Sequence, residues 1–85
     1  MTMKLYVGNL PASATEADLH GKFARFGQVL TVAIECDAAT GRSKRFGYVE
    51  MGSEADAHTA ASRLNMTQYD DMVISVNKLR IRLGR

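Results

Sequence analysis

The sequence has few of the residues on which disulfide bonds, metal clusters and membrane spans depend. It contains no tryptophan, one proline and a single cysteine, Cys36. One cysteine excludes an internal disulfide and a cysteine-rich metal site, and it is typical of a reducing compartment. The apolar run near the N-terminus, MTMKLYVGNL, is too short for a signal peptide or a membrane span. We therefore expect an intracellular, cytoplasmic protein without a metal, a cofactor or a membrane segment.

Net charge is also small, but the basic residues are unevenly placed. The chain has 11 basic and 9 acidic residues, which gives a net charge of +2. Seven of the 11 basic residues fall in two short segments: Arg42, Lys44 and Arg45, and Lys78, Arg80, Arg82 and Arg85. Such clusters suit phosphate groups. Judged from charge alone, the two clusters fit a solvated loop and a solvated tail at least as well as a phosphate-binding surface.

The length and the residue patterns predict one small α+β domain. The chain has 85 residues, of which 46% are hydrophobic, enough for a single core. Thr15 and Ser53 are each followed three residues later by an aspartate, which is typical of helix N-termini. The segment that contains Tyr69, Asp70 and Asp71 is expected to be irregular. β-branched and aromatic runs predict strands at 4–9, 29–35, 44–51 and 73–78.

This order, βαββαβ, predicts a ferredoxin-like fold. Its natural packing is a four-stranded antiparallel sheet with both helices on one face. No predicted element remains to cover the other face of the sheet. The question is then which side chains of the strands face solvent.

Alternation along the first and third strands answers this question. On each strand the aromatic residues share a side with charged residues, and the aliphatic residues occupy the opposite side. Burying these charged side chains without partners would cost on the order of several kcal/mol each. The aliphatic side must therefore be the core. The buried side then carries Leu5, Val7, Val49 and Met51. The exposed side carries Lys4, Tyr6, Lys44, Phe46, Tyr48 and Glu50.

Three exposed rings among positive charges fit two kinds of partner. Aromatic rings stack on unpaired bases at about 1–3 kcal/mol per base, while cations contact the phosphates. Exposed aromatic patches also mark protein–protein interfaces, so a protein partner or a second copy stays open. No nucleophile with a base, carboxylate pair or metal cluster is apparent, and we expect no catalytic residues.

Four sequence motifs resemble those of the RNA recognition motif family. LYVGNL at 5–10 resembles the second ribonucleoprotein motif, and KRFGYVEM at 44–51 resembles the first. Between them, L-x-x-x-F-x-x-F-G at 19–27 and D-x-x-T-G-R-S at 37–43 also fit. The resemblance implies one such domain over 1–85, with a core at about 3–80, a short basic segment at 79–85 and a sheet order of 4-1-3-2.

The resemblance also implies the binding residues. Tyr6 and Tyr48 would each stack on a base, Phe46 would pack against sugars, and Lys44 would contact a phosphate. Further candidate contacts are Lys4, Arg42, Arg45, Asn77, Lys78, Arg80 and Arg82. The implied partner is short single-stranded RNA, with single-stranded DNA as a weaker alternative. We expect a monomer with no small-molecule substrate, and a protein-interaction module is the alternative function.

The sequence departs from the family pattern at three positions. Arg45 stands where the first motif usually has glycine, and Met51 replaces a core aromatic residue. Asp71 occupies a position where the family often turns on glycine before the last strand. Arg45 adds charge near the expected RNA path and requires room in the loop, and at Asp71 the resemblance defines neither the turn nor the roles of Tyr69 and Asp70.

Overall fold

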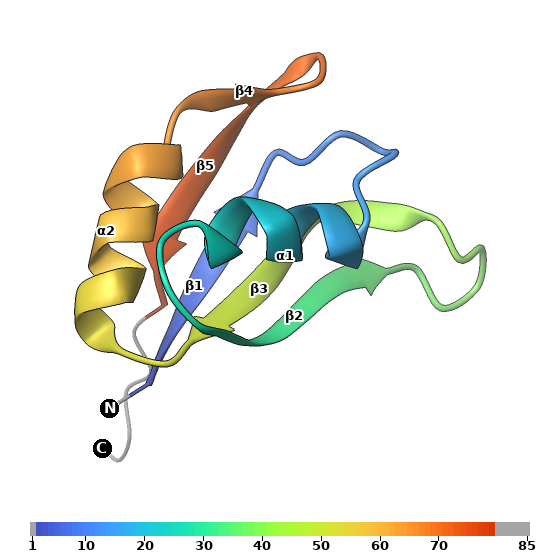
Figure 1. Cartoon of the computed structure of the whole chain (residues 1–85). Coiled ribbons are helices and arrows are strands. Elements are labelled where there is room, and N and C mark those ends of the chain that lie inside the picture. Colours follow the sequence, from blue (N-terminus) through green and yellow to red (C-terminus); the bar gives the residue numbers. More distant parts are fainter. Residues whose placement is uncertain (1, 80–85) are drawn as a thin grey trace, which may run out of the picture.

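Two helices lie against one face of an antiparallel sheet in the computed structural model, which describes residues 2–79 (Figure 1). The strands are ordered β2-β3-β1-β5-β4 across the sheet. The elements are β1 (Met3–Gly8), α1 (Glu16–Ala24), β2 (Val29–Cys36), β3 (Ser43–Met51), α2 (Glu54–Leu64), β4 (Thr67–Tyr69) and β5 (Met72–Lys78). The predicted sheet order is confirmed, with β5 as the last of the four predicted strands.

The sequence predicted an irregular segment before β5. This prediction is wrong, because the segment forms an additional short strand, β4. β4 pairs antiparallel with β5, where Thr67 faces Ile74 and Tyr69 faces Met72. Met66 and Asp70, with φ of 62° and 54°, take left-handed conformations at the two ends of β4. These two residues turn the chain without glycine and add β4 at the edge of the sheet.

Both helices begin at the predicted capping residues. The Thr15 hydroxyl accepts a hydrogen bond from the Asp18 backbone N–H at 3.0 Å. The Ser53 hydroxyl accepts one from the Asp56 N–H at 3.1 Å. Each cap satisfies a backbone donor that the first helical turn leaves free. The helices are thereby fixed in the positions from which they cover the sheet.

The core lies between the helices and the aliphatic side of the strands, as predicted. Met51 is fully buried there, in the place of the aromatic residue that the family usually has. A flexible thioether side chain fills irregular space, which explains why the exchange is tolerated. The fully buried residues of the core include Leu5, Val7, Val49, Leu19, Phe23, Ala57 and Ala60.

Tyr69 joins the additional strand to the first helix. The residue is 5% exposed, and its hydroxyl donates a hydrogen bond to Asp18 Oδ2 at 2.9 Å. Lys22 Nζ lies 4.4 Å from the centroid of the ring, within the range of a cation–π interaction. Tyr69 is therefore a structural residue of the core edge.

The Tyr69 hydroxyl should make stability depend on pH. Burial and then the hydrogen bond to Asp18 raise the pKa of Tyr69 to about 12, above the value of about 10 in an unfolded chain. The neutral hydroxyl therefore stabilises the fold below about pH 10, and this contribution is lost as the pH rises toward 12. Tyr69→Phe should lower the free energy of unfolding by about 1 kcal/mol at neutral pH. In urea unfolding, the wild type should lose stability above pH 10 more steeply than Tyr69→Phe, and parallel curves would contradict this assignment.

The outer edge of β2 is partly closed by α1 and by a bulge. The backbone N–H of Ile34 donates to Glu16 Oε2 at 3.2 Å, so a helix side chain occupies a donor of the edge strand. The pairing of β2 with β3 shifts register between Val29 and Thr31, and Leu30 at the bulge is 42% exposed. Both features interrupt the regular row of backbone groups along this edge.

No helix among residues 2–79 is long and apolar enough to cross a membrane. The same residues include no cluster of three or more His, Cys, Asp or Glu side chains placed to hold a metal ion.

Candidate nucleic-acid interface

The sheet face opposite the helices carries a straight row of four side chains from four strands. Tyr6 on β1 lies directly opposite Tyr48 on β3 and Asn77 on β5. Tyr48 in turn lies opposite Ala33 on β2. A ligand that crosses the strands at this level would meet Ala33, Tyr48, Tyr6 and Asn77 in turn.

The three aromatic rings of this face form a triangular cluster. The centroid of the Tyr6 ring is 5.8 Å from that of Phe46 and 6.0 Å from that of Tyr48. The Phe46 and Tyr48 centroids are 6.1 Å apart, with ring planes at 86°. All three rings are partly exposed, as the alternation predicted. Mutual edge contacts hold the rings in place and leave other parts of their surfaces open to solvent.

Gly8 makes room for one of these rings. A Cβ atom at this position would lie 2.8 Å from Cε2 of Tyr6 and 3.0 Å from Oγ of Ser75. Any larger residue would therefore displace the Tyr6 ring from its position over the strand. Gly8 belongs to the first motif in chain order, LYVGNL, and this contact gives a physical reason for glycine at its fourth position.

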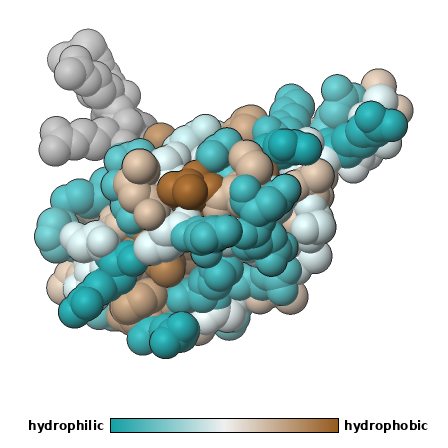
Figure 2. Space-filling view, turned by 90° about the horizontal axis from the view of Figure 1, so that it is seen from above, coloured by the Kyte–Doolittle hydropathy of each residue, from teal (hydrophilic) through white to brown (hydrophobic). Residues whose placement is uncertain are grey.

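Charged side chains flank the rings at both ends of the strands. At one end, Lys4 lies opposite Glu50, which also accepts a hydrogen bond from Thr31 Oγ1 at 3.4 Å. At the other end, Lys44 is exposed, next to the loop that joins β2 to β3. Figure 2 shows that hydrophilic residues cover most of the projecting end of this hairpin. Lys44 thus places a positive charge on the loop side of the aromatic cluster, while Lys4 and Glu50 make the other end electrostatically mixed.

Arg42 and Arg45 line a depression of about 630 Å³ beside this loop, together with Ala12, Gly41 and Ser43. Arg45 has a φ of 65°, in the left-handed region that favours glycine. Its backbone is held there by hydrogen bonds from its own N–H to Ser43 Oγ and from the Leu10 N–H to its carbonyl, both at 2.9 Å. The left-handed backbone explains why the family usually has glycine at this position. In this chain the same backbone conformation is strained, because arginine occupies the position.

This strain can be measured with two substitutions that both remove the guanidinium. Arg45→Gly relieves the left-handed strain, whereas Arg45→Ala keeps it. We expect the glycine variant to have a free energy of unfolding about 1 kcal/mol higher than that of the alanine variant. Thermal unfolding of the two variants would show this difference, and equal midpoints would mean that the site relaxes to a conformation without strain.

The structure separates one predicted contact from the others. Lys78 lies opposite Leu5 on β1, so its side chain is on the helix side of the sheet. Its Nζ is 3.4 Å from Nδ1 of His58 on α2. Lys4, Asn77 and the three aromatic residues are brought together on the open face. Arg80 and Arg82 lie outside the described residues.

A sheet with helices on one face and aromatic rings beside basic side chains on the other is the arrangement of α+β domains that bind single-stranded nucleic acid. The chain belongs to the RNA recognition motif family, whose sequence profile matches residues 5–75.

Similar proteins match almost the whole chain. RbpB of Nostoc sp. strain PCC 7120, named as an RNA-binding protein, is 40% identical over 83 residues, which are 98% of this chain and 81% of that protein. The crystal structure of RNA-binding protein PG1 has a TM-score of 0.90 at 35% identity and covers 96% of this chain and 99% of its own. A structure described as the Sxl-lethal protein/RNA complex has a TM-score of 0.83 at 30% identity, over 88% of this chain and 46% of that one.

Proposed function

We propose that this protein binds short single-stranded RNA across the open face of its sheet. The observation that carries the proposal is the cluster of Tyr6, Phe46 and Tyr48, whose ring centroids lie within 6.1 Å of one another on a face that no described element covers. Exposed rings at such spacing offer stacking surfaces for successive bases. The presence of an RNA complex among the similar structures supports the same interpretation.

We assign each side chain of the face a role on the basis of its position. Tyr6 and Tyr48 lie in the row across the strands and would stack on two bases. Phe46, two residues before Tyr48 on β3, would pack against the sugar between the two stacked bases. Asn77 ends the row and offers both a donor and an acceptor to a base edge.

The basic residues supply the contacts to phosphates. Lys44 is exposed at the loop end of the aromatic cluster, and Arg42 and Arg45 follow beside it in the adjacent depression. Lys4 is positioned at the opposite end of β1, where Glu50 partly offsets its charge. With two to four such contacts, affinity should be on the order of micromolar and its logarithm should fall with the logarithm of salt with a slope of about −2.

The working unit in this proposal is one chain that binds without catalysing a reaction. The row from Ala33 to Asn77 is complete within a single sheet and needs no residue from a second copy. RNA is distinguished from DNA by contacts to the 2′-hydroxyl, for which polar groups such as Asn77 and Ser75 are available on this face.

Titration of fluorescently labelled oligonucleotides tests the proposal. Single-stranded RNAs of about eight nucleotides should bind with micromolar affinity, because their bases are free to stack. The same sequences in duplex form should bind far more weakly, because their bases are already stacked and paired. Single-stranded DNA of the same sequence measures the contribution of the 2′-hydroxyl. Tighter binding to the duplex than to the single strand would overturn the proposal.

A further inference from the structure

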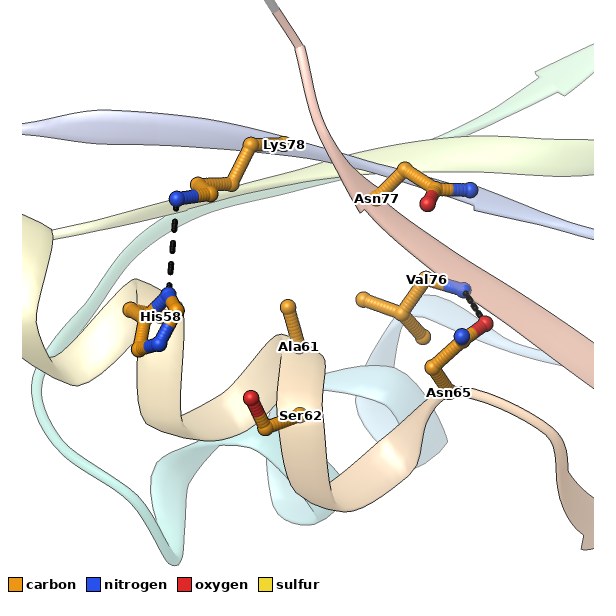
Figure 3. A pocket seen from close by; sticks show the side chains of 7 residues that line it. All are labelled: His58, Ala61, Ser62, Asn65, Val76, Asn77 and Lys78. Atoms are coloured by element: carbon orange, nitrogen blue, oxygen red, sulfur yellow. Dashed lines mark hydrogen bonds between the residues drawn. The ribbon is translucent and has the colours of Figure 1, made fainter.

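A pocket of about 250 Å³ lies between α2 and the C-terminal half of β5 (Figure 3). One side of the pocket is formed by α2 and the other side by β5. The lining consists of His58, Ala61, Ser62 and Asn65 from the helix and the cap that follows it, and Val76, Asn77 and Lys78 from β5. Apart from Asn77, none of these residues has a part in the aromatic face described above.

The pocket exists because β4 stops short of the end of β5. β4 pairs only with the segment from Met72 to Ile74, so within residues 2–79 no strand pairs with the outer edge at 76–78. The Val76 N–H on this edge instead donates to Asn65 Oδ1 at 2.9 Å. Because the Leu79 N–H points the other way, to the Lys4 carbonyl, alternation directs the Lys78 N–H to the same edge as that of Val76.

The pocket is rich in hydrogen-bond donors and has no carboxylate in its lining. Lys78 contributes an ammonium group, which has donors only. His58 Nδ1, 3.4 Å from that ammonium, must therefore be the acceptor, so a neutral His58 ring carries its proton on Nε2. The Asn65 oxygen is engaged with Val76, its amide N–H groups have no partner among residues 2–79, and Ser62 adds a hydroxyl. A small anion with several acceptor oxygens, such as a phosphate, matches this set of groups.

The pocket is continuous with the row of side chains on the aromatic face. Asn77 is the last residue of that row and also lines the pocket. An RNA strand that crosses Tyr48 and Tyr6 reaches the sheet edge at Asn77, at the level where β4 no longer covers β5. Beyond this edge, the described part of the chain presents the donors of the pocket, those of Lys78, Ser62 and Asn65.

We propose that the pocket between α2 and β5 binds a backbone phosphate of the RNA strand at the point where the strand leaves the sheet. The inference rests on the proposed function and adds a second, helix-backed contact to it. Its chemical basis is an ion pair with Lys78, supported by neutral donors from α2. A strand long enough to pass the edge gains this contact, and a strand confined to the sheet does not.

Two RNA lengths and one matched pair of variants test the site. Lys78→Gln should weaken binding of an eight-nucleotide RNA by about three- to tenfold and reduce the salt slope by about 0.7, the value for one phosphate on a single strand. Binding of a three-nucleotide RNA should not change. Arg63→Gln, an exposed position on the last turn of the same helix and outside the pocket, should change neither. Thermal unfolding should show that both variants keep the wild-type midpoint.

Replacing one RNA phosphate at a time by an uncharged methylphosphonate identifies the phosphate that the pocket binds. One uncharged linkage should weaken binding to the wild type and have no effect on Lys78→Gln. If no linkage shows this coupling, or if Lys78→Gln weakens the short and the long RNA alike, the pocket assignment is overturned while stacking on the sheet stands. If His58 and Ser62 NMR signals respond to inorganic phosphate but not to the eight-nucleotide RNA, the site takes free anions and the RNA assignment is overturned. Failure of the wild type to bind any single-stranded RNA overturns both proposals.

Discussion

Tyr48→Ala is expected to weaken binding of single-stranded RNA by about five- to 150-fold, which corresponds to the loss of about 1–3 kcal/mol from one stacked base. Tyr48 lies in the interior of the cross-strand row, opposite both Tyr6 and Ala33. Its ring also makes edge contacts with Tyr6 and Phe46 at centroid distances of 6.0 and 6.1 Å. Removing Tyr48 therefore deletes one stacking surface and loosens the two that remain. Fluorescence anisotropy with an eight-nucleotide RNA would measure the effect.

The matched control keeps the ring and removes only its hydroxyl. Tyr48→Phe should retain affinity to within about threefold, because stacking needs the ring face and not the hydroxyl. The salt slope should be the same for both variants, since neither substitution removes a phosphate contact. Equal affinities of Tyr48→Ala and the wild type would exclude stacking on this face as the binding mechanism.

Gly47→Ala is expected to lower the free energy of unfolding by about 3 kcal/mol, at the upper end of the usual range for overpacking. A Cβ atom at Gly47 would overlap the carbonyl oxygen of Ala33 on β2 and would approach the Cα of Ile34 to 3.1 Å. Both obstacles are backbone atoms of a paired strand, so no side-chain rotation can relieve the clash. The pairing of β2 with β3 would have to open instead, as a lower urea midpoint would show.

Gly21 provides the control for this prediction. It lies inside α1, and apart from its chain neighbours and the backbone of its own helix, no atom lies within 4 Å of where a Cβ atom would be. Gly21→Ala should therefore raise the free energy of unfolding by about 0.5–1 kcal/mol through its higher helix propensity. The same added methyl group is thus expected to have opposite effects at the two positions. If Gly21→Ala lowered the free energy of unfolding as much as Gly47→Ala, the loss of stability at Gly47 could not be attributed to the clash with β2.

The open face could be predicted from the sequence because its signals are local. Along β1 and β3 the rings alternate with aliphatic residues and share a side with Lys4, Lys44 and Glu50. The cost of burying charge decides between the two sides before any tertiary contact is known. The same alternation, applied to β5, places Asn77 on the open face.

The role of Tyr69 could not be predicted in this way, because its partners are distant in sequence. The hydrogen bond to Asp18 spans 51 positions, and β4 is only three residues long. A strand this short shows no periodicity, and the neighbouring aspartates suggested a loop. Only the tertiary packing of β4 against α1 shows that the ring is part of the core edge.

Charge was a poorer guide than alternation at Lys78 and Arg45. The sequence grouped Lys78 with the basic residues after β5, although its strand position places it on the helix side, beside His58. At Arg45 the sequence showed the absence of the usual glycine but not the left-handed backbone that explains it. In both cases backbone geometry, not residue type, determines where the charge is placed.

The hydrogen bond from the Ile34 N–H to Glu16 bears on how several such domains would share one RNA. An edge strand with free donors is a template on which a second sheet can grow. Because a carboxylate already occupies the Ile34 donor and a bulge interrupts the strand at Leu30, the β2 edge offers no continuous row of donors to a neighbouring copy on the same RNA. On the β2 side, the spacing of such copies would then be set by the RNA and not by pairing between their sheets.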